Sequence, residues 1–398
     1  MQESTALTTS SPRIVAIDAF RGFVMLLMLA EAMRLWTLEA VFPGSRFWAL
    51  VAYNTEHVPW QGCSLHDLIQ PAFSFLVGAA LPFSIASRQA RGHTFRGMVL
   101  HAVWRSIALI ALGIFLRSLD RSRTYWTFED TLTQIGLGYT FLFLLAFASV
   151  RTQAIAFAAI LAGFWAAFVL YPLPGPDFNY PAVGVPADWP HLYSGFLAHF
   201  NKNSNLSWAF DTWFLNLFPR LEPFRFNRGG WSTLSFIPTL ATMILGLWCG
   251  EWLKSARGTG DKLKGLIAAG LALTFAGLAL QWLHVVPIVK RIWTSSYTLY
   301  SGGLVILILA AFYFLIEVRG WRRWAFPLLV IGANSIAVYV MSWTLEDFVK
   351  GALARHLGNA PFAILGAPFE PVLQGAAVVL VFWLVLLWMY RRRIFVKI

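Results

Sequence analysis

The densest group of chemically competent side chains lies between Asn54 and Pro71. His57 stands ten residues before Asp67, and a turn between them would let the carboxylate contact the imidazole. Such a pair holds the ring in one tautomer and leaves its second nitrogen free as a general base. Alternatively, Asp67 has a structural role, because Ser64-x-x-Asp67 is typical of a helix N-terminus. The segment therefore predicts an acid–base pair, a helix start, or both.

Two other side chains of this segment are weaker candidates. His66 adjoins Asp67 in the sequence only, so it is our second choice for the base. Cys63 would be an acyl-accepting nucleophile if a nearby histidine activated its thiolate. A small buried hydrophobic residue is the more usual role of a free cysteine. No metal-ligand spacing such as H-x-x-x-H occurs here, so we expect no metal site.

Ionisable residues inside apolar segments are energetically costly, so each is a functional candidate. Asp18 and Arg21 share one helix face, and they form either a local ion pair or a site where Arg21 binds a phosphate. Glu31 follows about 15 Å further along the helix axis, with Arg34 as its simplest partner. Arg105 lies in a later apolar segment and is expected to face the bundle, because lipid exposure would cost a few kcal/mol.

The composition excludes an ordinary soluble protein. Of the 398 residues, 58% are hydrophobic and only 13% are charged, whereas soluble chains carry about 25% charged residues. The net charge is +12, but the basic residues stand between apolar segments and form no aromatic-basic stripe that would bind nucleic acid. The 2 cysteines are too few for a disulfide scaffold. We expect an all-α, polytopic protein of the cell (inner) membrane, with the lipid bilayer as partner and no nucleic acid.

A helix that crosses a bilayer needs about 20 mostly apolar residues, and ten segments meet this condition. We therefore expect a bundle of about ten transmembrane helices, at 16–35, 67–87, 98–116, 132–150, 153–171, 233–253, 263–283, 297–317, 326–343 and 371–390. Lysine and arginine are denser in the short segments on the side of the chain ends, which predicts that both termini are cytoplasmic.

We expect a single domain preceded by a short polar tail. Residues 1–12 are polar and are expected to be a disordered N-terminal tail, followed by a single transmembrane domain at 13–398. The charges of Asp18 and Arg21 inside the first apolar segment argue against a cleaved signal peptide.

The longest connection, at about 172–232, is extracytoplasmic in this topology. It is rich in Pro, Asn and Trp, and its tryptophans include Trp189, Trp208, Trp213 and Trp231. Such a loop suits a lid over an outward cavity, since aromatic rings stack on sugar faces. The alternative is an aromatic belt at the membrane interface, where tryptophan is enriched in any case.

Two specific motifs and three supporting ones follow one another along most of the chain. The specific motifs are R-I-V-A-I-D-A-F-R-G at 13–22 and H-x-x-W-x-G at 57–62, the latter continued by D-L-I-x-P-x-F-x-F-x-x-G at 67–78. The supporting motifs are Ser232-Thr233-Leu234 with Gly246, Lys290-x-Ile292-Trp293-Thr294, and Gly332-x-Asn334-Ser335-Ile336-x-x-Tyr339. In this order they resemble the transmembrane acetyltransferases typified by heparan-α-glucosaminide N-acetyltransferase, in a bacterial-type form without the long luminal N-terminal domain.

The resemblance implies a fold of about ten or eleven helices that takes acetyl-CoA from the cytoplasm. The acetyl group would pass to an amino sugar or hydroxyl of an extracytoplasmic carbohydrate, with His57 as the active-site base and Asp67 as its carboxylate. CoA phosphates require cations near the inner mouth. The donor-binding candidates are Arg13, Asp18, Arg21, Arg105, Asn334 and Ser335. The acceptor-binding candidates are Glu31, Trp60 and Tyr297.

The chain departs from the family pattern at three places. Glu31-Ala32 stands where members often carry Asn, Ala16 replaces a Ser of the opening motif, and Arg228-Gly229-Gly230 replaces an acidic residue before S-T-L. These departures leave the acceptor open, and the sequence leaves open whether a homodimer forms.

A transporter or permease for a sugar or lipid-linked precursor is the alternative hypothesis, because the embedded charges and the aromatic loop fit it equally well. The lack of an internal repeat and the asymmetric His57–Asp67 segment favour the enzyme. A third hypothesis is a covalent acyl-enzyme on Cys63.

Overall fold

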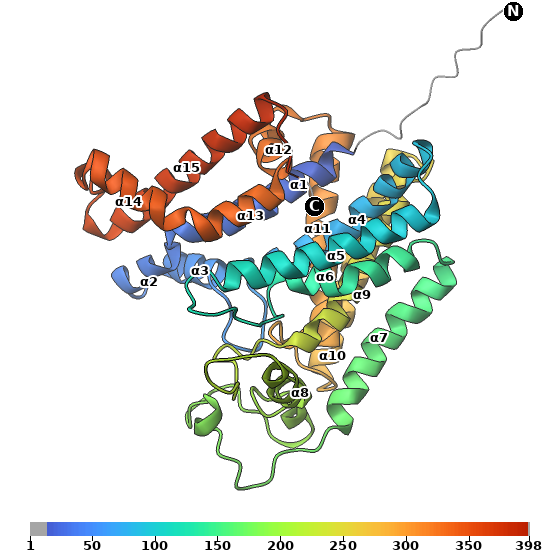
Figure 1. Cartoon of the computed structure of the whole chain (residues 1–398), viewed down its shortest axis with the longest axis vertical. Helices are drawn as coiled ribbons and strands as arrows, with labels where there is room; N and C mark the ends of the chain where they lie inside the picture. The colour runs from blue at the N-terminus through green and yellow to red at the C-terminus, as the bar shows by residue number, and fades with distance from the viewer. Residues whose placement is uncertain (1–13, 397–398) are drawn as a thin grey trace, which may run out of the picture.

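The computed structural model describes residues 14–396, and in this range the protein is built from helices and connecting segments, with one isolated β-bridge (Figure 1). The α-helices are α1 (Val15–Leu29), α2 (Leu38–Val41), α3 (Arg46–Thr55), α4 (Ile69–Ala90), α5 (Phe95–Arg117), α6 (Thr131–Leu145), α7 (Val150–Leu170), α8 (Leu206–Phe214), α9 (Phe236–Lys254), α10 (Thr259–Trp282), α11 (Ser295–Tyr313), α12 (Phe326–Gly332), α13 (Ser335–Thr344), α14 (Glu346–Leu357) and α15 (Glu370–Arg391). Arg13, a predicted donor-binding residue, and the predicted tail 1–12 lie outside the described residues.

Short 3-10 turns join or extend these helices, and a π-helical turn (Phe314–Val318) extends α11. The 3-10 turns are Ala30–Met33, Leu35–Thr37, His66–Leu68, Pro181–Val183, Gly195–Phe200, Leu215–Leu217, Thr233–Ser235, Arg323–Ala325, Ala360–Phe362 and Ala367–Phe369. The turn at His66–Leu68 matters most, because it opens the helix that carries the site.

The chain is a multi-pass membrane protein. Within residues 14–396, 7 helices are long and apolar enough to cross a membrane, or up to 8 if one bent pair forms a single span. These spans are His66–Ala90, Phe95–Arg117, Val150–Leu170, Thr233–Lys254, Thr259–Trp282, Ser295–Val318 and Ala367–Arg391. The bent pair is Arg323–Gly332 with Ser335–Thr344, whose axes meet at 66°.

The predicted number of about ten spans is too high for the described residues, and three of the predicted segments account for the difference. The segment 16–35 leaves the α-helix at Leu29 and continues as a 3-10 turn, and the segment 132–150 is helical only to Leu145. The segment 326–343 is broken by the bend between α12 and α13. Hydropathy counts apolar residues in a window, but it does not register where the backbone ends a helix or turns.

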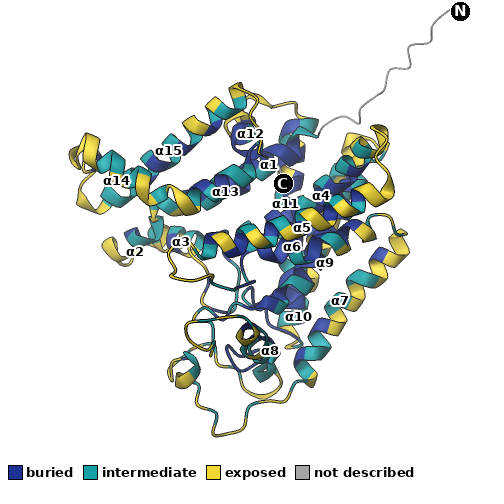
Figure 2. Ribbon diagram, viewed as in Figure 1, coloured by how far each residue is buried: buried dark blue, intermediate teal, exposed yellow. Residues whose placement is uncertain are grey.

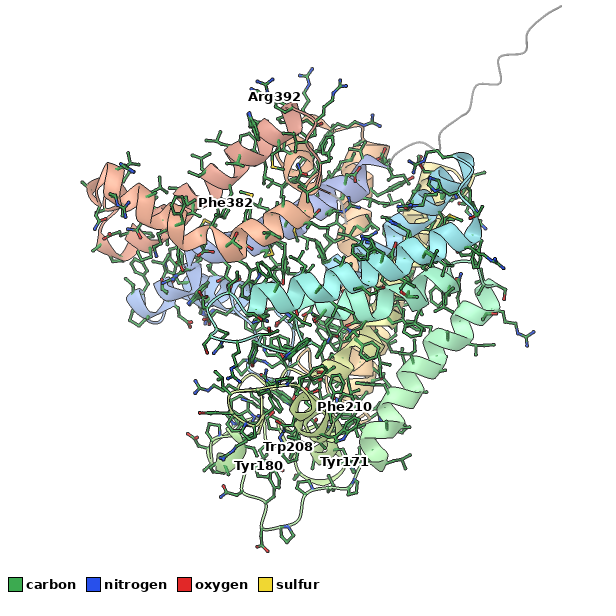
Figure 3. The ribbon with its side chains drawn as sticks, viewed as in Figure 1. Tyr171, Tyr180, Trp208, Phe210, Phe382 and Arg392 are labelled. Carbon is green, nitrogen blue, oxygen red and sulfur yellow. The ribbon has the colours of Figure 1, made fainter. Side chains whose placement is uncertain are left out.

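Helix α1 begins and α15 ends on one side of the molecule, and the segment 172–232 lies on the opposite side (Figure 1). Arg392 marks the first side, and Tyr180 and Trp208 mark the second (Figure 3). That both chain ends are cytoplasmic stays a prediction from the lysine and arginine distribution.

Helices α4, α9 and α11 form the buried centre, and α7 and α10 expose most of their surface (Figure 2). Two glycines bring α4 and α9 close together: a Cβ at Gly78 would overlap the backbone of Met243, and a Cβ at Gly246 would overlap that of Phe75. Small residues at such crossings are the usual basis of tight helix packing in membranes. This packing holds α4 firmly in the centre of the bundle.

Candidate active site

The turn before α4 is organised around the carboxylate of Asp67, which is 1% exposed. Asp67 Oδ2 accepts hydrogen bonds from the N–H groups of Ser64 (3.1 Å) and Val58 (3.2 Å). In return, the Asp67 N–H donates to Ser64 Oγ (3.1 Å), which is the reciprocal arrangement expected of Ser-x-x-Asp at a helix start. The cap and the carboxylate pair are therefore not alternatives, because one oxygen serves each.

The other carboxylate oxygen contacts the imidazole. His57 Nδ1 lies 2.8 Å from Asp67 Oδ1. A carboxylate only accepts hydrogen bonds, so Nδ1 must carry the proton, and Nε2 of the neutral ring then has a free lone pair. The His57 side chain is 38% exposed and stands against the rings of His66 and Trp231. The arrangement is that of a general base open to a ligand.

Lys290 completes the cluster, and we did not predict a site role for it from the sequence. Its Nζ lies 3.3 Å from Asp67 Oδ1 and 3.2 Å from His57 Nδ1, and the residue is 2% exposed. A buried ammonium beside a buried carboxylate neutralises a charge that would otherwise be costly. The only sequence signal was its place at the head of the supporting motif K-x-I-W-T.

A short pairing of two loops brings Lys290 to His57. Gln61 and Val289 form an antiparallel bridge, and the Gly62 N–H donates to Ile288 O (2.9 Å). Gly62 has φ +119°, a conformation that side chains rarely adopt, so glycine is needed at this turn. Arg291 then donates to the backbone oxygens of Val58 and Gly229, which ties a third loop to the site.

Burial and the neighbouring charges set the protonation state of His57. Burial lowers the pKa of His57, and the nearby Lys290 charge lowers it further, which outweighs the opposing effect of Asp67. Burial also lowers the pKa of Lys290, against the attraction of Asp67. His57 is therefore neutral near pH 7, the state in which it accepts a proton.

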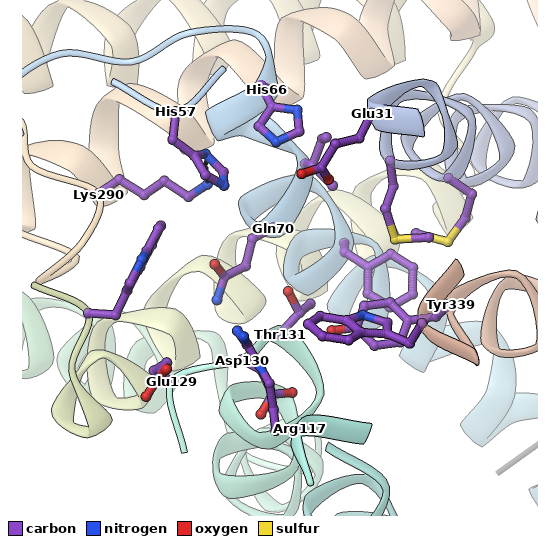
Figure 4. Close-up of a pocket in the computed structure, with 16 residues that line it drawn as sticks. Glu31, His57, His66, Gln70, Arg117, Glu129, Asp130, Thr131, Lys290 and Tyr339 are labelled. Atoms are coloured by element: carbon purple, nitrogen blue, oxygen red, sulfur yellow. Dashed lines mark hydrogen bonds between the residues drawn. The ribbon is translucent and has the colours of Figure 1, made fainter. Parts of the chain in front are cut away.

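His57 opens onto a cavity of about 170 Å³, which we call the outer cavity because Trp231 of the 172–232 segment also lines it (Figure 4). The polar residues that line it come from five different parts of the chain. They are Glu31, His57, His66, Gln70, Arg117, Glu129, Asp130, Thr131, Lys290 and Tyr339. The predicted acceptor residue Glu31 is therefore on this cavity, together with the predicted base.

Two acids across this cavity escaped the sequence analysis. Burial raises the pKa values of Glu129 and Asp130, although Thr127 donates to Glu129 and the backbone N–H groups of α6 donate to Asp130. Asp130 caps α6, and an acid directly before Thr131 and an apolar run is a signal that would have placed it there. A wall of carboxyl groups opposite a neutral base suits a ligand rich in hydroxyl or amino groups.

A second cavity, of about 420 Å³ and called the inner cavity below, is lined by three of the six predicted donor-binding residues. Arg21, which pairs with Asp18 at 3.2 Å, lines it, as do Arg105 and Ser335. Arg88 and His101 also line it, with 2.6 Å between Arg88 Nη2 and His101 Nε2. Several cations around one cavity are the chemistry that binds a phosphate-bearing ligand.

Two predicted acceptor residues are structural rather than exposed to either cavity. Trp60 is 0% exposed, and its Nε1–H donates to Phe200 O (3.2 Å), because the outer loops close over it. Tyr297 is also 0% exposed, and its hydroxyl donates to the backbone oxygen of Asp67 (2.8 Å). Tyr297 thus supports the turn that holds Asp67.

Asn334, a predicted donor residue, holds the C-terminal segment. Its Nδ2 donates to Ile394 O (3.0 Å), and its Oδ1 accepts from the Val396 N–H (2.9 Å). Val396 lines the inner cavity, and Asn334 itself is fully buried. Asn334 therefore acts on this cavity through the segment that it holds.

The remaining expectations concern Cys63 and the outer loop. The Cys63 thiol donates to Ser64 O, and burial raises its pKa, so that it is a poor nucleophile. Trp231 lines the outer cavity, and a lid role for its segment stays a prediction. Trp189 packs under Lys202, and Trp208 donates to Arg225 O, so these rings stabilise the loop itself.

Comparison with known proteins finds two relatives, and the chain has the same sequence identity to both. The chain is 23% identical over 388 residues to the heparan-alpha-glucosaminide N-acetyltransferase of Mus musculus, covering 85% of the chain and 55% of the relative. It is 23% identical over 385 residues to the Homo sapiens protein of that name, covering 86% and 54%. The chain thus spans about half the length of the curated relatives it matches. No family model matches the chain. The chain is a distant relative of a membrane acetyltransferase family.

Proposed function

We propose that the protein is a membrane-bound acyltransferase. It moves an acetyl group from acetyl-CoA, bound in the inner cavity, to a hydroxyl or amine of a carbohydrate in the outer cavity. The observation that carries the proposal is the His57–Asp67 hydrogen bond, which leaves His57 Nε2 as a proton acceptor at the cavity. The distant relation to an N-acetyltransferase supports the choice of acyl group and acceptor.

The reaction follows from these positions. The acceptor nitrogen or oxygen attacks the thioester carbonyl, and its proton moves to His57 Nε2. The tetrahedral intermediate then collapses, the carbon–sulfur bond breaks, and the CoA sulfur takes the proton from the imidazolium. Asp67 stays ionised throughout and stabilises the imidazolium that forms. Lys290 keeps the resting imidazole neutral, since a second positive charge beside it is unfavourable.

Donor binding falls to the arginines of the inner cavity. Arg21, Arg88 and Arg105 offer planar donor groups that bind phosphate oxygens in pairs. The turn between α4 and α5 lies on the side where α1 begins (Figure 1). That side is predicted to be cytoplasmic, so the proposed donor cavity lies toward the compartment that supplies acetyl-CoA.

The test is a pair of histidine variants of the full-length protein in detergent. Acetyl transfer from labelled acetyl-CoA is measured with a glucosaminide, the acceptor that the relatives are named for. His57→Ala is expected to lower the rate by about 10²–10⁴-fold, as for loss of a general base. His66→Ala is the matched control, since it lines the same cavity without a bond to Asp67. Full activity in His57→Ala would exclude the mechanism.

A transporter remains the second candidate, on one specific observation. The bend of 66° between Arg323–Gly332 and Ser335–Thr344 resembles the discontinuous helices at transporter binding sites. CoA-dependent thermal stabilisation distinguishes the two: CoA at 100 times its Kd should stabilise the enzyme by about 2.7 kcal/mol. A carrier for a sugar would show no such shift.

A further inference from the structure

One face of α4 lines both cavities. Ile69 and Gln70 line the outer cavity, and Leu76, Ala80 and Arg88 line the inner one. From Gln70 to Arg88 the steps are six, four and eight residues, which are multiples of three or four, so these side chains share one helical face, with Ile69 beside it. The 22 residue steps from His66 to Arg88 cover about 33 Å along the helix axis, close to the thickness of a bilayer core, about 30 Å.

Phe73 is the residue of α4 that both cavities share. It is 9% exposed, and it stands between the outer group at 69–70 and the inner group at 76–88. His57 lies on the outer cavity, whereas the arginines lie on the inner cavity. His57 and the arginines thus lie on two different cavities that both border this ring.

Two other helices also contribute residues to both cavities. At the start of α6, Thr131 lines the outer cavity and Leu132 the inner one. In α13, Ser335 lines the inner cavity, and Tyr339, one turn later, lines the outer one. Three helices therefore share one boundary, and an aromatic ring from α4 lies at it.

We propose that the Phe73 ring is the partition between the two cavities and limits the size of the acyl group that reaches His57. The inference rests on the proposed acyl transfer for its second half only. A thioester held by the inner arginines must pass its acyl end beyond this ring, and each additional methylene needs the ring to move further. The ring also keeps the water of the two cavities apart while no donor is bound.

The partition is tested without reference to any reaction. Gln70→Cys is introduced in a background with Cys63→Ser and Cys249→Ser, and sealed vesicles receive a charged methanethiosulfonate on the side of the α4–α5 turn. Excess glutathione quenches the reagent on the other side. Adding Phe73→Ala removes the ring and is expected to raise the labelling rate about tenfold or more, as for a barrier lower by about 1.4 kcal/mol. Leu76→Ala, which enlarges the inner cavity only, is the matched control. Equal labelling with and without the ring would overturn the partition.

Size selection is tested by transfer from acetyl-, butyryl- and hexanoyl-CoA. Phe73→Ala is expected to raise kcat/KM for butyryl-CoA relative to acetyl-CoA about tenfold or more, in line with the discrimination that single methylenes produce in a pocket. Leu76→Ala should leave this ratio unchanged, and Phe73→Trp should lower acetyl transfer while CoA still stabilises the protein. An unchanged ratio in an active Phe73→Ala variant would overturn size selection. If the parent protein transfers no acyl group, yet Phe73→Ala still raises labelling, the proposed function fails and the partition stands.

Discussion

Replacement of Asp67 by asparagine probes the central hydrogen bonds with the least change of shape. Asp67 Oδ2 accepts from the N–H groups of Val58 and Ser64, so the oxygen of a new amide must take that place. Its NH₂ group then faces His57 Nδ1. Two donors cannot share this contact, so the ring must accept there and carry its proton on Nε2. In that tautomer His57 cannot take a proton from the acceptor.

The magnitudes follow from the two partners that Asp67 holds. The wrong tautomer lowers kcat about 10⁴-fold in the serine-protease triad, which corresponds to about 5 kcal/mol of transition-state stabilisation. Lys290, at 2% exposure, also loses its counter-ion. Breaking a buried ion pair typically costs about 3–5 kcal/mol of stability. Asp67→Asn is therefore expected to lose both activity and stability.

Two assays separate the effects: acetyl transfer, and thermal unfolding of the purified protein in detergent. The double variant Asp67→Asn with Lys290→Met removes the uncompensated ammonium, so it should regain part of the melting temperature without regaining activity. Transfer by folded Asp67→Asn at more than about a tenth of the parent rate, a loss under 1.4 kcal/mol, would refute the proposed tautomer. A double variant no more stable than Asp67→Asn would refute the ion pair.

Three further outcomes are expected. Burial and the Lys290 charge lower the pKa of His57 below 6.5, so the transfer rate should stay on its plateau as the pH falls through 6.5. Lys290→Met should raise the pKa of His57 and move the acidic limb of the pH–rate profile to higher pH. An acidic limb that does not move would contradict this account. Arg105→Gln should raise the CoA concentration for half-maximal thermal stabilisation about tenfold or more, with the rate at saturating donor little changed; an unaltered CoA titration would remove Arg105 from donor binding. Gly246→Ala should lower the stability by about 1–3 kcal/mol, because its Cβ meets the α4 backbone. Gly163→Ala is the control and should leave the stability unchanged, because nothing lies within 4 Å of its Cβ. Equal melting temperatures of the two variants would show that the α4–α9 contact is not tight.

Much of the fold could be predicted from local sequence. Each of the ten predicted segments contains a helix, because long apolar runs in a membrane protein must satisfy their backbone groups internally. The prediction of spans failed where a helix ends inside an apolar segment. This happens after Leu29, after Leu145 and at the bend between α12 and α13. Hydropathy carries no information about such breaks.

Part of the candidate site could also be predicted from local sequence, and the rest could not. The contact of His57 with Asp67 was predictable, since ten residues and a Ser-x-x-Asp helix start constrain where both side chains go. Lys290 was not predictable in that role, because it lies 233 residues from His57 along the chain. Glu129 reaches the same cavity from yet another connection.

The sequence by itself determined that this chain crosses a membrane and that an imidazole and a carboxylate meet before α4, since both follow from composition and short spacings. The tertiary structure alone decided the charge that surrounds that pair and the position of Phe73 between two cavities. Both depend on which distant helices pack against α4, and the glycine contacts with α9 and the loop bridge at Gln61 and Val289 set that packing.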